Sequence, residues 1–407
     1  MMAALLGLAL SNLFIRSSMG VLAPELAEDL DMSPVVLGAT ASAFFFAYAI
    51  FQIPGGMLLD RFGPRRVIVG LFLLTSAGTY LFSFAPGGGT MLIARIIMGI
   101  GCAAIFPGAF MLISRFYPAD RLTSVAGIMN SFAMMGMFLA TFPLAYLVTS
   151  IGWRQGFLLI AMATTVLTVF AWFAIRDWPP SIDGTPPKST ENLRQILSGV
   201  GQALATRHVL NIASAGIALS AGSVFLGLWG GPYLNDVHGL TETERGEVLM
   251  YMAFAGVAGH FTFGNMARIL NTLKGLVLFG TGAATLITAT LAAVPEPSQL
   301  TVTVLFAALG FACGYPSVLL AHARAIMPDR LMGRGIAVVN TGIMIAIALM
   351  QTAVGTVISI LTPVGQAVSA DSYRIAFAFL AFMAFLSFIL YIRVEDRRPR
   401  DTQPSAH

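Results

Sequence analysis

Long runs of apolar residues, separated by short polar connections, make up most of this chain. Windows of about 19 residues divide it into twelve predicted transmembrane helices. Each run has about the length that crosses a hydrocarbon core, and none alternates as a barrel strand does. A segment in lipid must satisfy its own backbone hydrogen bonds, so helix is predicted throughout. The predicted helices cover residues 2–25, 34–58, 66–86, 90–114, 122–149, 155–176, 207–234, 244–268, 273–294, 299–325, 331–361 and 372–393.

Composition supports an integral membrane protein. The 407 residues are 57% hydrophobic and 10% charged, whereas soluble domains are about a quarter charged. Such a chain has too little polar surface to cover a water-soluble fold. Cys102 and Cys313 both lie in apolar runs, and their spacing indicates neither a disulfide nor a metal site. We therefore predict no cofactor and no metal.

The basic residues predict the orientation of the helices. Of the 23 lysines and arginines, 18 fall in the connections after even-numbered helices or in the C-terminal tail, and three fall in odd-numbered connections. Basic residues concentrate on the cytoplasmic side of membrane proteins. Both termini are therefore expected in the cytoplasm, in a multi-pass protein of the plasma (cytoplasmic, or inner) membrane. The same distribution explains the net charge of +4 without nucleic-acid binding.

A single long polar stretch divides the chain. Its Pro, Ser and Thr residues indicate a cytoplasmic linker, and the part after Thr190 favours a short amphipathic helix on the membrane face. The expected organisation is an all-α protein of two six-helix pseudo-repeats around a central cavity. Its parts are a first bundle at 1–176, a linker at 177–206, a second bundle at 207–393 and a tail at 394–407.

The two bundles share a pattern of residues. A shift of 208 aligns Pro24 with Pro232 and Gly38 with Gly246, and later matches follow the same order with small insertions. These include Pro107 with Pro316, Asn130 with Asn340, and Trp153-Arg154 with Tyr373-Arg374. The alternative is that Gly and Pro coincide by composition, since both are common in membrane helices. Parallel repeats of this kind place a binding site near the membrane midplane, and rocking of the halves gives alternating access.

The connection between the second and third predicted helices carries the most specific motif, Gly56-Met-Leu-Leu-Asp60-Arg61-Phe-Gly63-Pro-Arg65-Arg66. It resembles the signature loop of the major facilitator superfamily. Arg95-x-x-x-Gly99-x-Gly101 is similar to a second motif of that family. The stretch from Pro24 to Leu30, with Ser42–Tyr48 and Gln52-Ile-Pro-Gly55, looks most like the organic anion–cation symporter branch. The resemblance implies a secondary transporter with twelve helices.

One departure from the superfamily concerns the fifth predicted helix. Residues 131–143 lack the Gly-Pro-x-x-Gly-Gly run that is typical of drug–proton antiporters in the family. This lowers the weight of a multidrug exporter without removing it.

We expect the signature loop to act as a gate. Gly56 would let its helix approach a neighbour closely. Asp60 would face the start of the eleventh helix, just after Asp329-Arg330, where the helix dipole favours a carboxylate. Arg61, Gly63, Arg65 and Arg66 complete the loop, and Arg268 replaces the aspartate in the second half, so the latch is single-sided. The alternative is a basic turn that only sets topology.

Arg16 is the most informative polar residue. It lies near the middle of the first predicted helix, and all 19 acidic residues lie in connections, tails or helix ends. A central arginine costs several kcal/mol unless it faces a cavity or a partner. Its planar fork suits a carboxylate or phosphate of a substrate. The alternative is a guanidinium satisfied by backbone carbonyls and water. Asn12 lies one turn away on the same face.

Other intramembrane polar residues are weaker candidates. Arg95 either lines the cavity or reaches to the interface. His260 is the deeply placed group that titrates near neutral pH, and the repeat aligns it with Gln52. It is a proton relay or a hydrogen-bonded structural histidine. The remaining candidates for the cavity are aromatic or amide side chains that could also pack between helices: Tyr48, Trp229, Tyr315, Asn130 and Asn340. For Trp229 the cavity is favoured, because its indole N–H needs a partner.

We predict a secondary active transporter of a small organic anion, acting as a monomer by proton symport or by exchange. One alternative is an exporter of amphipathic or drug-like compounds, since 21 Met and 30 Phe residues would form an adaptable cavity. Another is a solute sensor that does not transport. An enzyme is not expected, because the chain has no phosphate-binding loop, no metal-ligand spacing and no intramembrane acid pair.

Overall fold

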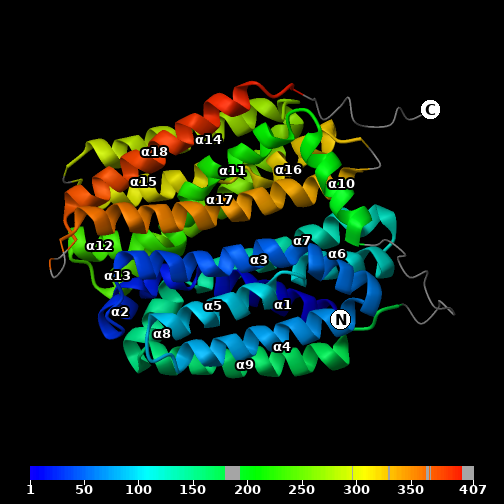
Figure 1. The fold of residues 1–407 in the computed structure, drawn as a ribbon, viewed down its shortest axis with the longest axis horizontal. Coiled ribbons are helices and arrows are strands. Elements are labelled where there is room, and N and C mark those ends of the chain that lie inside the picture. Colours follow the sequence, from blue (N-terminus) through cyan, green and yellow to red (C-terminus); the bar gives the residue numbers. More distant parts are fainter. Residues whose placement is uncertain (179–192, 296, 329–330, 364–365, 367, 397–407) are drawn as a thin grey trace.

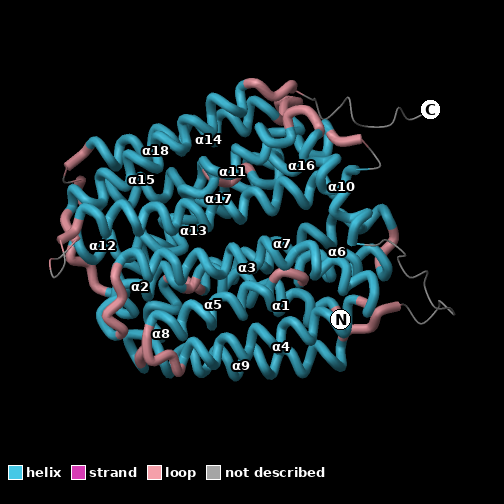
Figure 2. The backbone as a smooth tube through the Cα atoms, viewed as in Figure 1, coloured by secondary structure: helices cyan, strands magenta, loops and turns pink. Residues whose placement is uncertain are grey.

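The computed structural model describes residues 1–407 except 179–192, 296, 329–330, 364–365, 367 and 397–407. The described chain is helical, with loops between the helices and no strand in that part (Figure 2). The helices lie roughly side by side in two groups (Figure 1). α1 begins and α18 ends on the same side of the assembly, which we name the terminus face. The other side is the opposite face.

The first bundle comprises α1 (Met2–Ser17), α2 (Met19–Asp29), α3 (Pro34–Phe62), α4 (Pro64–Ser83), α5 (Gly88–Cys102), α6 (Ile105–Phe116), α7 (Ala119–Leu139), α8 (Phe142–Ile151) and α9 (Trp153–Ala174). The predicted amphipathic helix is α10 (Leu193–Ala205). The second bundle comprises α11 (Val209–Val224), the π-helix η1 (Phe225–Trp229), α12 (Gly230–His238), α13 (Glu242–Ile269), α14 (Lys274–Ala293), α15 (Gln299–Ala312), α16 (Pro316–Ile326), α17 (Met332–Leu361) and α18 (Ala370–Ile392).

Several predicted helices are interrupted. The first bends by 46° between α1 and α2, and the fifth bends by 41° between α7 and α8. The fourth and tenth are each divided as well, into α5 and α6 and into α15 and α16, and η1 interrupts the seventh. Broken helices free backbone groups that must find partners within the protein, and in transporters such breaks border the binding site.

The number of membrane spans can be read from length and hydropathy. Nine helices of the described residues are long and apolar enough to cross a membrane, and eleven are counted when each bent pair is one span. The remaining predicted span is α13, which has 28 residues but begins with Glu242, Glu244 and Arg245 and carries His260. The twelve predicted helices therefore correspond to helical segments, although α13 is not recognised by hydropathy alone.

The internal repeat appears as matched contacts at the opposite face. In the first bundle, Trp153 Nε1 donates to Asp29 Oδ2 at 3.0 Å and Arg154 Nη2 donates to the Ala85 carbonyl at 3.4 Å. In the second bundle, the Tyr373 hydroxyl donates to Asp236 Oδ2 at 2.7 Å. Arg374 Nε likewise donates to the Ala292 carbonyl at 3.1 Å. The two halves thus use the same contacts at equivalent positions, as a structural repeat requires.

A second matched contact lies at the terminus face. In each bundle, an aspartate that follows the last helix caps the start of the third predicted membrane helix. This helix is α4 in the first bundle and α14 in the second. Asp177 Oδ1 accepts the Arg65 backbone N–H at 2.8 Å, at the beginning of α4. Asp396 Oδ1 accepts the Lys274 backbone N–H at 3.3 Å, at the beginning of α14. Carboxylates at these ends satisfy free N–H groups and oppose the positive end of the helix dipole.

The buried core shows where the two bundles meet. One cluster of buried apolar residues includes Leu22 and Leu37 of the first bundle with Trp229 and Val248 of the second. A separate cluster within the first bundle contains α1 residues from Ala4 to Ala9, nearest the terminus face. The shared core therefore lies toward the opposite face.

We predict that Asp177→Ala lowers the midpoint of thermal unfolding in detergent. Loss of a helix-capping side chain costs about 0.5–2 kcal/mol. Asp396→Ala should act in the same direction but less strongly, because its contact with Lys274 N is longer. Glu28→Ala, which removes an exposed acid from α2 at the opposite face, is the control. An unchanged midpoint for Asp177→Ala would contradict the capping role.

Candidate functional site

A cavity of about 250 Å³ lies between the two bundles. Helices α1, α3 and α7 contribute to it from the first bundle, and α11, η1, α13, α15, α16 and α17 contribute from the second. Most of its wall is apolar, and a few polar groups project from it, as in sites for small molecules. Its polar residues are Arg16, Ser17, Ser223, His260, Cys313 and Asn340.

Arg16 is the permanent cation of this cavity. Its guanidinium lies over the Phe45 ring, 5.1 Å from the centroid. Among the described residues it has no hydrogen bond or ion pair. In the part of the chain that the structure describes, no acidic side chain lines the cavity. Arg16 therefore lines the cavity, and its charge is available to a ligand.

The bend between α1 and α2 places Arg16. The carbonyl of Ile15 accepts hydrogen bonds from Ser18 Oγ at 3.0 Å and from Arg95 Nη1 at 2.9 Å. Arg95 is only 1% exposed, and its guanidinium stacks 4.6 Å from the centre of the Phe44 ring. Both readings of Arg95 from the sequence are therefore wrong. It neither reaches the interface nor lines the cavity, because the broken helix offers it a carbonyl inside the first bundle.

His260 projects into the cavity from α13. Its Nδ1 lies 2.9 Å from the carbonyl oxygen of Gly256 on the same helix. A carbonyl only accepts hydrogen bonds, so Nδ1 carries the proton in this contact. Nε2 is then an acceptor that has no protein partner among the described residues. Gln52, its repeat equivalent, does not line the cavity and accepts a hydrogen bond from Thr341 Oγ1 at 3.0 Å.

Asn340 lines the cavity, and its repeat equivalent Asn130 does not. Asn130 lies on an exposed position of α7, one turn from Met134, which does line the cavity. The sequence analysis also missed Ser17 and Ser223. A serine in a long apolar run is common in membrane helices, so no signal distinguished these two.

The other predicted cavity residues connect helices instead. Asn12 Nδ2 donates to the Cys102 carbonyl at 2.8 Å, where α5 ends. Trp229 Nε1 donates to the Gln351 carbonyl at 3.2 Å, and the Tyr315 hydroxyl donates to the Ala215 carbonyl at 2.9 Å. Their assignment to the cavity wall was wrong because each polar tip is used by backbone at a helix crossing.

Tyr48 also lies outside the cavity wall. It is 6% exposed and stacks on Phe44, with 6.2 Å between ring centroids. It lies close enough to Arg16 to interact with it electrostatically. Tyr48 therefore belongs to the packing behind the cation.

The signature loop packs on the end of α9. Gly63 has a φ of +82° and ends α3, and a Cβ there would lie 2.9 Å from Asp177 Oδ1. Arg65 Nε donates to the Trp172 carbonyl at 3.0 Å. The expected close approach at Gly56 is absent, since nothing lies within 4 Å of a Cβ placed there. The neighbouring Gly55 is the one that approaches another helix, since a Cβ there would lie 3.4 Å from the Ala104 Cβ.

The remaining loop residues are exposed. Arg61 and Arg66 point to the surface of the terminus face. Asp60 is exposed and interacts electrostatically with Arg115 of the same bundle. Its expected neighbours Asp329 and Arg330 lie outside the described residues.

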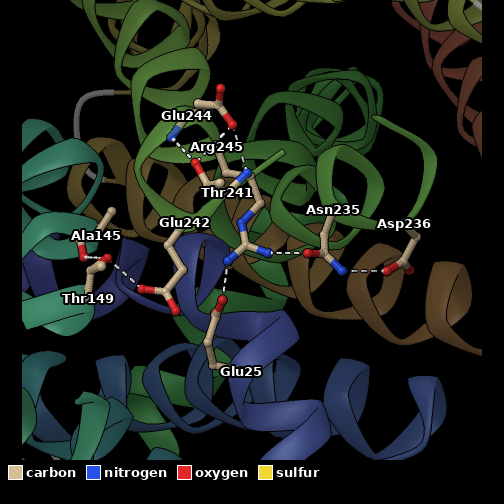
Figure 3. A network of polar contacts seen from close by, with 9 residues as sticks. All are labelled: Glu25, Ala145, Thr149, Asn235, Asp236, Thr241, Glu242, Glu244 and Arg245. Carbon is tan, nitrogen blue, oxygen red and sulfur yellow. Dashed lines mark hydrogen bonds and ion pairs between the residues drawn. The ribbon is translucent and has the colours of Figure 1, made fainter. Parts of the chain in front are cut away.

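A polar network joins the bundles at the opposite face (Figure 3). Arg245 of α13 forms an ion pair with Glu25 of α2, and its side chain is 2% exposed. Arg245 Nη1 also donates to Asn235 Oδ1 at 2.6 Å. Nearby, Thr149 Oγ1 of α8 donates to Glu242 Oε2 at 2.6 Å. Thr241 and Glu244 form a capping box that begins α13, which places Arg245 in its first turn.

Glycines bring the backbones of the bundles together beside this network. A Cβ on Gly231 would lie 2.0 Å from the carbonyl oxygen of Gly20. A Cβ on Gly20 would in turn lie 2.0 Å from the carbonyl oxygen of Leu226. Any other residue would separate α2 from η1 and α12. Together with the shared core, these glycine contacts close the path from the cavity to the opposite face.

Relatives with curated descriptions are bacterial transporters. The probable sulfoacetate transporter SauU of Cupriavidus necator is 30% identical over 164 residues, 40% of this chain. The probable galactarate/D-glucarate transporter GudP of Escherichia coli is 26% identical over 270 residues, 60% of this chain. These matches span only 38% and 60% of the length of the two relatives. A putative tartrate transporter of Agrobacterium vitis is 25% identical over 68% of the chain and 70% of its own length.

Solved structures share the fold. A bacterial homolog of the human lysosomal transporter Spinster, in an inward-facing and unoccupied conformation, aligns with a TM-score of 0.76 and 17% identity. The alignment covers 96% of this chain and 95% of that chain. A D-xylose–proton symporter aligns with a TM-score of 0.75 and 14% identity. The sequence profile of the Major Facilitator Superfamily matches residues 5–351, and the chain belongs to this family of multi-pass membrane transporters.

Proposed function

We propose that this protein is a secondary active transporter of a small organic anion, with Arg16 as the anion-binding group. The unpaired guanidinium in the cavity carries the proposal. A cation in a solvent-poor site is costly unless an anion joins it, and a carboxylate fits its planar fork through two hydrogen bonds. The names of the relatives point the same way, since sulfoacetate, glucarate and tartrate are all organic anions.

The proposed transport mechanism is alternating access, by proton symport or exchange. The contacts at the opposite face support one closed gate: the Glu25–Arg245 pair, the Thr149–Glu242 hydrogen bond and the shared core. On the terminus side of the cavity, the Gln52–Thr341 hydrogen bond joins α3 to α17. Rocking of the bundles would break the first set of contacts and bring the loop around Asp60 toward α17.

The distribution of basic residues supports the proposed orientation. In the sequence, 18 of the 23 lysines and arginines fall in the connections after even-numbered predicted helices or in the C-terminal tail. We therefore propose that the terminus face is cytoplasmic, in the plasma membrane. The cavity then opens inward when the opposite face is closed. We also propose the division into residues 1–176, 177–206, 207–393 and 394–407, and a monomer as the working unit, because the cavity lies within one chain.

A second candidate function has some support from the cavity wall. Met134, Met137, Met252 and Met344 line it, together with Phe45. Methionine is flexible and polarizable and adapts to varied apolar ligands. Export of an amphipathic compound is therefore the alternative if the anion is not bound.

We predict that Arg16→Gln loses anion binding while the protein still folds, since the substitution removes a desolvated charge. Loss of a charged contact in such surroundings costs about 2–5 kcal/mol. Arg16→Lys keeps the charge but not the fork, so it should bind weakly. Binding is measured by calorimetry and thermal stabilisation with D-glucarate, tartrate and sulfoacetate.

The matched control for this experiment is Arg207→Gln. The Arg207 side chain is 81% exposed, and it pairs with Glu395 away from the cavity. It should bind as the wild type does. Wild-type anion affinity in Arg16→Gln would overturn the proposal and favour the amphipathic exporter.

We predict that Arg245→Gln opens the opposite face. Removing one partner of a buried ion pair costs about 3–5 kcal/mol, and here only the closed state bears this cost, so the balance of states shifts more than 100-fold. The readout is Cys313, which lines the cavity. In proteoliposomes and a Cys102→Ser background, a membrane-impermeant thiol reagent added at the opposite face should label Cys313 faster. Glu25→Gln with Arg245→Gln should recover part of the closure, and equal labelling in all variants would refute the gate.

We predict that Asp60→Asn weakens closure of the terminus face. In the Arg245→Gln background, it should increase labelling of Cys313 from the terminus face, because the state closed there loses its carboxylate. Asp31→Asn, at an exposed site of the opposite face, serves as the control. Unchanged labelling from the terminus face would show that Asp60 has no gating role.

A further inference from the structure

The cavity places one ionisable nitrogen base on each bundle. Arg16 comes from α1 of the first bundle and His260 comes from α13 of the second. Arg16 keeps its charge at every physiological pH, whereas imidazole gains or loses a proton near neutrality. A ligand in the cavity therefore meets a fixed cation on one side of the bundle interface and a group that can become a cation on the other.

The backbone holds the His260 ring in place. A Cβ on Gly259 would lie 2.4 Å from the carbonyl oxygen of Phe311, at the end of α15. A Cβ on Gly314 would lie 2.4 Å from the carbonyl carbon of Gly259. Thus α13 and the break between α15 and α16 touch through backbone atoms beside His260. With Nδ1 bound to Gly256, Nε2 is the atom that remains for a ligand or a proton.

The groups that face His260 contain no carboxylate. Across the cavity they are Arg16 of α1 and the Cys313 thiol between α15 and α16. The charged and titratable residues on α13 itself and on the helices packed against it lie outside the cavity wall, mostly toward helix ends. They are Glu242, Glu244, Arg245, Glu247, Tyr251 and Arg268 on α13, Glu25, Glu28 and Asp29 on α2, Arg121 on α7, Tyr146 on α8, Tyr233, Asp236 and His238 on α12, Lys274 on α14, and His322 and Arg324 on α16. At the opposite face, Glu25 pairs with Arg245, and Asp236 accepts a hydrogen bond from Tyr373.

We propose that His260 is a second anion subsite, and that it takes up one proton when a substrate with two acidic groups binds. One group of the dianion pairs with Arg16, and the other accepts a hydrogen bond from Nε2–H of protonated His260. The proton comes from water on the open face, adds to the Nε2 lone pair and leaves when the substrate leaves. The filled cavity then holds two positive and two negative charges, which a low-dielectric site favours.

This inference rests on the proposed function and narrows it. A short dianion that joins α1 to α13 would connect the two bundles, and one proton would cross with each substrate. A monoanion needs Arg16 alone and recruits no proton. His260 would thus couple a dianionic substrate to a proton in a cavity where the described residues contribute no acidic side chain.

The experiment compares matched acids with the intact protein in detergent. The probes are D-glucarate against D-gluconate and tartrate against threonate, which differ by one carboxylate, with sulfoacetate as a further dianion. Calorimetry is done at pH about 7.5, where an unperturbed histidine side chain is mostly neutral. It is repeated in two cationic buffers of different protonation enthalpy, Bis-Tris and imidazole, so that the difference in binding enthalpy gives the number of protons taken up. We expect at least one dianion to bind about 10- to 100-fold more tightly than its monoanion, with uptake of about one proton.

Three variants separate the roles. His260→Gln should remove both the proton uptake and the preference for the dianion. His260→Arg supplies a permanent cation, so it should keep the preference for the dianion without proton uptake. This variant also tests the proposal if His260→Gln does not fold. His238→Gln is the control, because His238 ends α12 at the opposite face and does not line the cavity.

The outcomes distinguish this inference from the proposed function. If monoanions and dianions bind equally through Arg16, or if proton uptake persists in His260→Gln, the second subsite is wrong and the anion carrier stands. If none of the five acids binds the wild-type protein, both proposals fail. If His260→Gln keeps both the dianion preference and the proton uptake of the wild type, the second subsite lies elsewhere and the role proposed for His260 is wrong.

Discussion

The structure depends on the requirement that backbone groups freed inside a membrane find partners within the protein. The clearest case is the carbonyl of Ile15, which loses its helical partner where α1 bends into α2 and is bound by Arg95 and Ser18. That bend directs Arg16 toward the cavity. Arg95 does not line the cavity, but it stabilises the helix break that positions Arg16.

The same requirement for partners distinguishes the two faces, because polar groups are enclosed at the opposite face and exposed at the terminus face. At the opposite face, glycines let helices touch through their backbones, and the Glu25–Arg245 pair is almost fully enclosed. A buried ion pair adds little net stability but is costly to separate. Such a pair suits a contact that defines one conformational state. At the terminus face, by contrast, the charged residues Asp60, Arg61 and Arg66 are exposed to the surface.

The repeat gives each bundle equivalent anchors and different chemistry. Asp29 with Trp153 and Asp236 with Tyr373 hold equivalent corners, and Asp177 and Asp396 cap equivalent helices. Within the cavity the symmetry ends. Arg16 and His260 come from non-equivalent helices, and Gln52, the repeat partner of His260, bonds to Thr341 outside the cavity wall. The internal repeat thus accounts for the equivalent contacts that hold the helices of each bundle. The cavity residues, by contrast, differ between the two bundles.

The sequence by itself determined the helical segments and the family, and it singled out Arg16, because hydropathy and the cost of a central charge are local properties. It did not determine where the helices break, or which polar side chains those breaks would use. Asn12, Trp229 and Tyr315 were expected in the cavity, yet their polar atoms bind carbonyls that only the packed helices bring within reach. The ion pair of Glu25 with Arg245 joins residues 220 positions apart, so only the tertiary structure decided it.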